Sequence, residues 1–401
     1  MTNLRHLLVL VVVLTSVSGV RAQTLTVLYD FQGDNDGSYP LDYGRLARGA
    51  SGNLFGTTEF GGACGQGTIF EVSPNQSGGW TESVLHAFCG SDGSVPLGAV
   101  ALDSSGNIYG TTSGEGNGTC GTVFELSGTT LNTLHAFTCE NDGGIPSAGV
   151  ILDNQGNLYG TANNVFEISK SGMFRVLYDF CQLPGCADGE NPSGGVVMDV
   201  AGNLYGTTSN GGDLSCVYAA NGCGVVYKLS RTGNSWSETA LHVFTGADTD
   251  GANPFYASLT LATEEINDTK ALVIYGVTSA GGQQGAGTVF EIIQQHLGFS
   301  FEVIHSFHCC FSDGTAPVGT LTLAKGVLYG TTPQGGSSDS GTVFNVSRKN
   351  NEWKESVIYS FRNGTDGGHP YSGVAIDSAG TLYGVASSDG GEFGDVYELT
   401  P

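Results

Sequence analysis

The sequence predicts an all-β protein, a seven-bladed β-propeller whose ring is closed by its N-terminal strand. Two observations lead to this fold. The segment 106–112, Gly-Asn-Ile-Tyr-Gly-Thr-Thr, recurs in related form seven times along the chain. Successive copies lie 54, 50, 46, 70, 54 and 54 residues apart, measured between their Tyr-Gly or Phe-Gly pairs. A four-stranded propeller blade occupies about 50 residues.

Each repeat contains four strand-like segments in a fixed order. The first is a short apolar run after a proline, such as 195–198, and the second is the Tyr-Gly-Thr-Thr segment itself. The third reads Thr-Ile-Phe-Glu at 68–71, and the fourth ends in Phe, as at 84–88. All four are short and rich in β-branched or aromatic residues, and Gly, Asn, Asp and Ser separate them. This is the pattern of strands joined by tight turns.

The repeat is offset from the ends of the chain. Residues 26–31 form a fourth-type strand before the first repeat, and residues 395–400 form a third-type strand with no fourth-type strand after it. We therefore expect these two segments to pair antiparallel and to complete the last blade. Closure of this kind removes a free sheet edge that would invite aggregation.

The first 22 residues read as a secretory signal peptide. Arg5 and His6 precede the apolar run 7–14, and small residues follow up to Ala22. The run is too short for a membrane anchor, which needs roughly 20 apolar residues. We expect residues 23–401 to form a single propeller domain that is secreted, extracellular or periplasmic, with no membrane span, and monomeric.

Charge and cysteine content agree with export. The chain has 14 Lys and Arg against 38 Asp and Glu, which argues against nucleic acid as a partner. The ten cysteines lie in two loop types that share one face of a propeller, and their placement predicts the disulfides Cys64–Cys89, Cys120–Cys139, Cys181–Cys186 and Cys216–Cys223. Cys309 and Cys310 remain, either as a vicinal disulfide or as two thiols.

The motifs Asn-Leu-Tyr-Gly-Thr-Thr, Gly-Gly and Gly-Thr-Val-Phe-Glu-Leu resemble a known family. It comprises the bacterial exported proteins called choice-of-anchor tandem-repeat GloVer-containing proteins, and the resemblance covers essentially the whole chain after the leader. It implies export and a repeat architecture, and it carries over no catalytic residue.

The sharpest repeated polar feature is Asp-Gly-x-x-Pro, which occurs in all seven repeats in the loop that leads to the next inner strand. Its aspartates are Asp36, Asp92, Asp142, Asp188, Asp250, Asp313 and Asp366. We interpret the motif first as a turn device, in which Asp accepts backbone hydrogen bonds and Gly supplies φ > 0. Calcium is the alternative, with Asp34 and Asp36, and Asp248 and Asp250, as oxygen ligands. No cofactor is certain.

Histidines recur at one position of the fourth-type strand, where other repeats carry tyrosine. His86, His135, His242 and His305 are equivalent to Tyr29, Tyr178 and Tyr359. A position that accepts either residue is best interpreted as a packing site and not as a metal ligand.

Residues that depart from the repeat are better candidates for a ligand site. Arg45 stands on the innermost strand where the other repeats have Ala99, Gly149, Gly195, Ser258, Thr320 and Gly373. A cation there would lie at the axis, with Asp36, Asp250, Tyr256 and Tyr371 as further candidates. Our leading hypothesis is a secreted binding module for an unidentified ligand, either a glycan or a protein. The alternative is a carbohydrate-active enzyme, a glycoside hydrolase or lyase, with an axial site.

Overall fold

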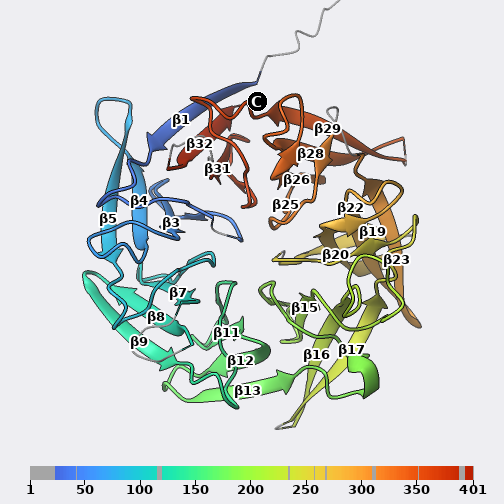
Figure 1. Ribbon diagram of the computed structural model, residues 1–401. Coiled ribbons are helices and arrows are strands. Elements are labelled where there is room, and N and C mark those ends of the chain that lie inside the picture. Colours follow the sequence, from blue (N-terminus) through green and yellow to red (C-terminus); the bar gives the residue numbers. More distant parts are fainter. Residues whose placement is uncertain are drawn as a thin grey trace, which may run out of the picture.

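The computed structural model describes residues 23–41, 43–114, 120–233, 235–256, 258–266, 269–308, 313–350, 352–387 and 393–400. Seven four-stranded antiparallel sheets are arranged as blades around a central axis (Figure 1). Within the described ranges the only helical segment is the 3-10 turn η1 (Pro184–Cys186). The predicted all-β, seven-bladed propeller is therefore confirmed.

The strands of each blade follow one another from the axis outward. Blade 1 contains β2 (Ala47–Arg48), β3 (Leu54–Thr58), β4 (Thr68–Pro74) and β5 (Trp80–Ala87); blade 2 contains β6 (Ala101–Leu102), β7 (Ile108–Thr112), β8 (Thr122–Ser127) and β9 (Thr130–Ala136). Blade 3 contains β10 (Ile151–Leu152), β11 (Leu158–Thr161), β12 (Asn164–Ile168) and β13 (Phe174–Asp179); blade 4 contains β14 (Val197–Met198), β15 (Leu204–Thr208), β16 (Val225–Thr232) and β17 (Ser235–Val243). Blade 5 contains β19 (Thr260–Ile266), β20 (Thr269–Thr278), β22 (Thr288–Gln295) and β23 (Gly298–Ser306); blade 6 contains β25 (Thr322–Ala324), β26 (Val327–Thr332), β28 (Thr342–Lys349) and β29 (Glu352–Ser360).

Blade 7 is assembled from both ends of the chain. Strands β30 (Ala375–Ile376), β31 (Leu382–Ala386) and β32 (Asp395–Thr400) are joined by β1 (Thr24–Asp30) as the outermost strand. β1 runs antiparallel to β32, with Thr26 opposite Glu398 and Val27 opposite Tyr397. Figure 1 shows the two strands side by side, β1 in blue and β32 in red. The pairing expected from the offset repeat is present.

The long interval in the repeat has a structural form that the sequence analysis does not anticipate. Residues 263–266 and 269–270 lengthen β19 and β20 into long paired strands, with pairs from Thr260↔Tyr275 to Ile266↔Thr269. Two short ladders, β18 (Gly251–Ala252) with β21 (Ala280–Gly281) and β24 (Gly314–Thr315) with β27 (Gln334–Gly335), tie loops together on the face that carries the Asp-Gly-x-x-Pro motifs.

The glycine of the Tyr-Gly pair is required by packing within the blade. A Cβ at Gly110 would lie 2.5 Å from Cζ of Phe124, the aromatic residue of the third strand of the same blade. Phe124 is fully buried, and so are its equivalents in the neighbouring blades. The repeated glycine and the repeated phenylalanine therefore form one packing unit, which is why the two recur together.

Threonines of the repeat connect strands and blades through buried hydroxyl groups. The hydroxyls of Thr112 and Thr122 lie 2.8 Å apart across β7 and β8, and the same pair recurs in blades 1, 5 and 6. The preceding Thr111 donates to the Ala148 carbonyl oxygen in the loop that enters blade 3, at 2.8 Å. Each threonine thus satisfies a polar group that would otherwise be buried without a partner.

The Asp-Gly-x-x-Pro motif fastens each blade to the preceding one. The residue before the proline has positive φ in all seven copies. In blade 3 this residue is Ile145, whose N–H donates to the Cys120 carbonyl oxygen of blade 2. The adjacent proline, Pro146, lies so close to Gly121 that a Cβ on Gly121 would come within 2.8 Å of its Cδ. Six blades have this glycine before the third strand, at a contact between blades, and blade 3 has Asn163 there, also with positive φ.

Replacing Gly121 by Ala should destabilise the protein much more than replacing Gly106. Both glycines have positive φ, 97° and 86°, but a Cβ at Gly106 meets no atom within 4 Å, whereas at Gly121 it would overlap the Thr112 carbonyl oxygen. We expect Gly106→Ala to cost about 1 kcal/mol from φ alone, and Gly121→Ala about 2 kcal/mol more from overpacking. Chemical denaturation of both variants measures the difference. Equal losses would contradict the contact between blades.

Four disulfides have the predicted pairing: Cys64–Cys89, Cys120–Cys139, Cys181–Cys186 and Cys216–Cys223. Each joins the two loop types on the face of the Asp-Gly-x-x-Pro motifs or closes one of them. Cys309 and Cys310, like the predicted signal peptide 1–22, lie outside the described residues.

Candidate functional site

The axis of the propeller contains a cavity of about 890 Å³. The innermost strands of all seven blades line it, and most of the lining residues are apolar, with polar atoms exposed among them. The position predicted to face the axis does so: Arg45, Ala99, Gly149, Gly195, Ser258 and Thr320 all belong to the lining. Small residues are needed there, because a Cβ on Gly149 would lie 1.9 Å from the Ala99 carbonyl oxygen of blade 2.

Arg45 projects into this cavity without a carboxylate partner. Its Nη1 donates to Thr322 Oγ1 of blade 6 at 3.2 Å, and the residue as a whole is exposed. The surrounding protein desolvates the guanidinium and lowers its pKa, although the side chain is open to the cavity. No ion pair of Arg45 is found among the described residues. Among the described residues, this cation therefore has no counter-charge.

A second arginine of blade 1, Arg48, also lines the cavity. Its equivalents in the other blades are apolar: Leu102, Leu152, Met198, Leu261, Leu323 and Ile376. The Arg48 guanidinium lies over the Tyr383 ring at 5.8 Å and has no carboxylate partner in the described part of the chain. Both departures from the repeat at the axis are therefore cations, and both come from blade 1.

Aromatic side chains meet above Arg45, on the face of the Asp-Gly-x-x-Pro motifs. Tyr43 stacks on Tyr256 with ring centroids 4.0 Å apart, and Tyr371 meets Tyr43 edge-on at 6.4 Å. Phe255 lies 3.8 Å from Tyr256. Because Tyr43 belongs to blade 1 and Tyr256 to blade 5, this contact spans the axis. The structure brings the predicted Tyr256 and Tyr371 together through Tyr43.

The sequence analysis missed Tyr43, although a signal for it exists. Tyr43, Tyr256 and Tyr371 each lie two residues before the axial position, where the other blades carry Leu97, Ser147, Ser193 and Val318. Glu59 was also missed. Its carboxylate is close enough to raise the pKa values of Tyr43 and Tyr256, after the larger effect of their burial, and burial raises its own pKa.

The seven motif aspartates lie away from the cavity and are all engaged in one repeated contact. Each accepts a hydrogen bond from the His or Tyr of the preceding outer strand, at 2.8 to 3.2 Å. The histidines interpreted as packing residues do pack, since His135 stacks on Phe174 and His242 on Phe301. Their link to the motif aspartate was not expected. Both side chains are flat rings with a hydrogen-bonding atom at the far end, Nε2 in His and the hydroxyl oxygen in Tyr. Either one can therefore bind the motif aspartate, which explains why this position accepts both residues.

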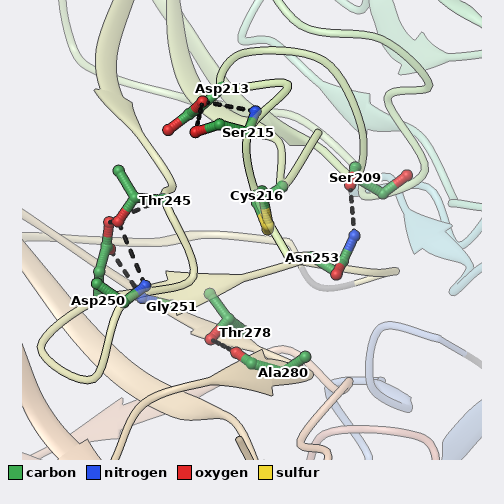
Figure 2. Close-up of a disulfide and its surroundings, with 12 residues drawn as sticks. Ser209, Asp213, Ser215, Cys216, Thr245, Asp250, Gly251, Asn253, Thr278 and Ala280 are labelled. Carbon is green, nitrogen blue, oxygen red and sulfur yellow. Dashed lines mark hydrogen bonds between the residues drawn. A yellow bond between two sulfur atoms is a disulfide. The ribbon is translucent and has the colours of Figure 1, made fainter. Parts of the chain in front are cut away.

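Asp36 and Asp250 are therefore separated from Arg45 and hold their own loops. Asp250 accepts from His242 Nε2, from Thr245 N and Oγ1 and from its neighbour Gly251 N, and Figure 2 shows the contacts to Thr245 and Gly251 beside Cys216. Asp36 accepts from Tyr29 and from Gln32 N. Asp34 and Asp248 are exposed. The turn interpretation accounts for these contacts, and calcium at the two pairs stays a prediction.

Three blade interfaces place a glutamate beside the motif aspartate. Glu82, Glu238 and Glu355 occupy the same position of an outer strand, and in the described part of the chain the inaccessible Oε1 of each has no hydrogen-bond partner. Burial and the charges of Asp36, Asp188 and Asp313 respectively raise the pKa of each glutamate to about 7. The sequence analysis did not find this arrangement.

The sequence of the chain matches one family along nearly its whole length. The model of the Gloeobacter/Verrucomicrobia repeat matches residues 14–164, 76–267 and 164–396. The chain belongs to this family. The resemblance drawn from the GloVer motifs is thereby confirmed. No curated protein is similar enough to this GloVer protein to match it.

Several solved structures match the GloVer chain over most of its length, with low sequence identity. The luciferin-regenerating enzyme has 14% identity and a TM-score of 0.45, with 94% of this chain and 95% of that one covered. A protein of unknown function from Dyadobacter fermentans has 12% identity and a TM-score of 0.45, with 95% and 100% covered. AofleA from Arthrobotrys oligospora has 11% identity and a TM-score of 0.39, with 84% and 90% covered.

In the part of the chain that the structure describes, no helix has the length and apolar character needed to cross a membrane.

Proposed function

We propose that this GloVer protein is an exported binding protein whose axial cavity takes a small organic anion, such as an acidic sugar. The observation that carries the proposal is the pair of arginines from blade 1, which line the cavity without a carboxylate partner among the described residues. A guanidinium forms charge-assisted, often bidentate hydrogen bonds with carboxylates, and its planar face packs on apolar groups.

The dimensions and wall of the cavity support a ligand of this class. A volume of about 890 Å³ lies within the range of small-molecule sites, roughly 300–1,000 Å³. Arg45 and Arg48 lie three residues apart along one extended segment, which separates their Cα atoms by about 10 Å. Side chains three residues apart on such a segment point to opposite sides of it, and the Arg48 guanidinium lies over the Tyr383 ring of blade 7, so Arg45 would be the first contact of an anionic ligand. The apolar residues at the equivalent position of the other blades would then pack against its body.

Export is part of the same proposal. The leader-like residues 1–22 and the four disulfides support it, because disulfides persist in oxidising compartments outside the cytosol.

The enzyme alternative receives no support from this geometry. Hydrolysis of glycosides requires two carboxyl groups about 5–10 Å apart that flank the reacting bond. In the described part of the chain no Asp or Glu lines the axial cavity. Asp36 and Asp250, which the alternative would use, bind their own loops through several hydrogen bonds.

Replacing Arg45 by Ala should weaken ligand binding without loss of stability. The mature protein is first screened on arrays of acidic and neutral glycans matched in length, with aliphatic dicarboxylates alongside. Calorimetry with the tightest acidic hit should then show a loss of about 10- to 100-fold, the value of a charge-assisted hydrogen bond in a desolvated site. Arg45→Lys should restore part of the affinity, because lysine keeps the positive charge but lacks the paired N–H donors with which a guanidinium binds a carboxylate.

Arg231→Ala is the matched control, because Arg231 is exposed on β16 and far along the blade from the axis. It should bind as the wild type does. Unchanged affinity of Arg45→Ala together with a lower melting temperature would show that Arg45 serves the fold. Preference of the wild type for neutral over acidic glycans would also contradict the proposal.

A further inference from the structure

The interface between blades 5 and 6 gathers four potential metal ligands. His305 lies on β23, and His308 and Asp313 lie in the loop that follows it, while Glu355 faces them from β29. His305 Nε2 is 3.2 Å and His308 Nδ1 is 3.5 Å from Asp313 Oδ2. One potential ligand atom each of His305, Asp313 and Glu355 lie within 4.8 Å of one another. We propose that these four side chains bind a single Zn²⁺ ion.

A cation would satisfy a group that the protein leaves unsatisfied. Glu355 Oε1 is inaccessible to solvent and receives no hydrogen bond from the residues that the structure describes. Asp313 is 6% exposed and Glu355 is partly buried, so two carboxyl groups lie close together with little contact with solvent. A buried carboxylate oxygen without a partner is costly, and a like-charged neighbour adds to the cost. A divalent cation held by both carboxylates would remove both costs.

Asp313 is already oriented for this role by the backbone. The N–H groups of His308 and Gly314 donate to its oxygens at 3.2 and 2.8 Å. Contacts of this kind fix a ligating carboxylate and are independent of the two imidazoles. Zn²⁺ would replace the present hydrogen bond between His305 Nε2 and Asp313. His308 is 47% exposed, which leaves an open side for entry of the ion.

The ligand set and its spacing favour Zn²⁺ over Ca²⁺ or Mg²⁺. Ligands about 2.0–2.1 Å from a tetrahedral zinc ion lie about 3.4 Å apart, close to the 3.2 and 3.5 Å between the imidazoles and Asp313. Two imidazole nitrogens with two carboxylates suit a transition metal, whereas Ca²⁺ and Mg²⁺ prefer oxygen ligands alone. The Glu355 carboxylate lies farther away and has to move toward the other ligands to become the fourth ligand of the ion.

The other six interfaces of the ring lack this combination. Glu82 and Glu238 stand at the position of Glu355, but the facing ring there is a tyrosine, Tyr29 or Tyr178. At the three interfaces where a histidine faces the next blade, the position of Glu355 holds Leu131, Phe174 or Phe301, and at the sixth interface Tyr359 faces the position of Leu25. The residue equivalent to His308 is Gln32, Cys89, Thr138, Cys181, Thr245 or Arg362. The ring thus supplies its own matched controls.

Zinc binding can be measured on the whole mature chain after removal of metal with a chelator. Titration of Zn²⁺ against a chromophoric chelator, with metal analysis after desalting, should give one ion per chain. His305→Tyr recreates the arrangement at Tyr178, and Glu355→Gln removes one charge while keeping the shape. Each should lower the affinity by about tenfold or more. Zn²⁺ should raise the melting temperature of the wild type and leave that of His305→Tyr unchanged.

The control variants are His242→Tyr and Glu238→Gln, which make the same changes at other interfaces and should bind Zn²⁺ as the wild type does. If His305→Tyr or Glu355→Gln misfolds, the zinc affinity of His308→Asn tests the proposal instead, because this exposed side chain can be replaced without disturbing the core. Wild-type zinc affinity in His308→Asn and Glu355→Gln would overturn the proposal. So would equal losses in His242→Tyr, tighter binding of Ca²⁺ than Zn²⁺, or loss of zinc only when Cys309 and Cys310 are replaced by serine.

Discussion

A chain that begins at Phe31, and so lacks β1, should lose more than about 5 kcal/mol of its free energy of unfolding. β1 covers the outer edge of β32 through the whole of its length. Its Leu28 belongs to the core cluster that includes Phe31, Phe70 and Val396. Without β1 this cluster opens to water, and β32 becomes an unpaired edge strand that promotes association.

The measurement is denaturant unfolding of the two chains, one beginning at Gln23 and one at Phe31, with light scattering to follow association. Addition of a synthetic peptide with the sequence 23–31 should restore stability to the shortened chain, because it can occupy the vacant edge. A shortened chain as stable as the mature one would show that the ring does not depend on this strand. Stabilisation by a scrambled peptide of the same composition would contradict pairing in register.

Replacing Glu238 by Gln should stabilise the protein at pH 8 and have no effect at pH 4. Burial, together with the charge of Asp188, raises the Glu238 pKa to about 7 in the folded protein, against ~4.3 in an unfolded chain. Below pH ~4 both states hold the proton and the group costs nothing. Between pH ~4.3 and about 7 the unfolded chain releases the proton while the folded protein retains it, so wild-type stability falls across this window and levels off above it.

The expected gain of Glu238→Gln at pH 8 is about 1–3 kcal/mol, less than the full pKa difference because the side chain is only partly buried. Glu238→Leu, which copies Leu131 of blade 2, should remove the same pH dependence. Ser237→Ala alters the exposed neighbouring residue and should leave the curve unchanged. The test is to measure the free energy of unfolding of each variant from pH 4 to pH 8. A parallel pH dependence in Glu238→Gln and wild type would show that this carboxyl group is not the cause.

The repeat made most of the fold predictable, because its recurring residues make the same contacts within each blade or between neighbouring blades. Gly110 and Phe124 recur together since one fills the space that the other leaves. The four disulfides followed from which loops carry cysteine. The lengthening of β19 and β20 was not predicted, because residues 263–270 depart from the repeat and only the pairing of the two strands reveals it.

The site was less predictable because its contacts join positions that no sequence spacing relates. Arg45 stood out as a lone charge among small residues, and Tyr256 and Tyr371 stood near it in the repeat. Their connection through Tyr43 required knowing that blades 1 and 5 meet across the axis. The carboxyl groups of Asp313 and Glu355 are likewise 42 residues apart in sequence and meet only because neighbouring outer strands face each other.

The most direct test of the account is a crystal structure of the protein with the tightest acidic ligand from the glycan and dicarboxylate screen. The account predicts that the ligand occupies the axial cavity and that an anionic group lies about 2.7–3.0 Å from the Arg45 guanidinium. A ligand bound on the outer loops or between blades, with the axial cavity holding only water, would contradict it.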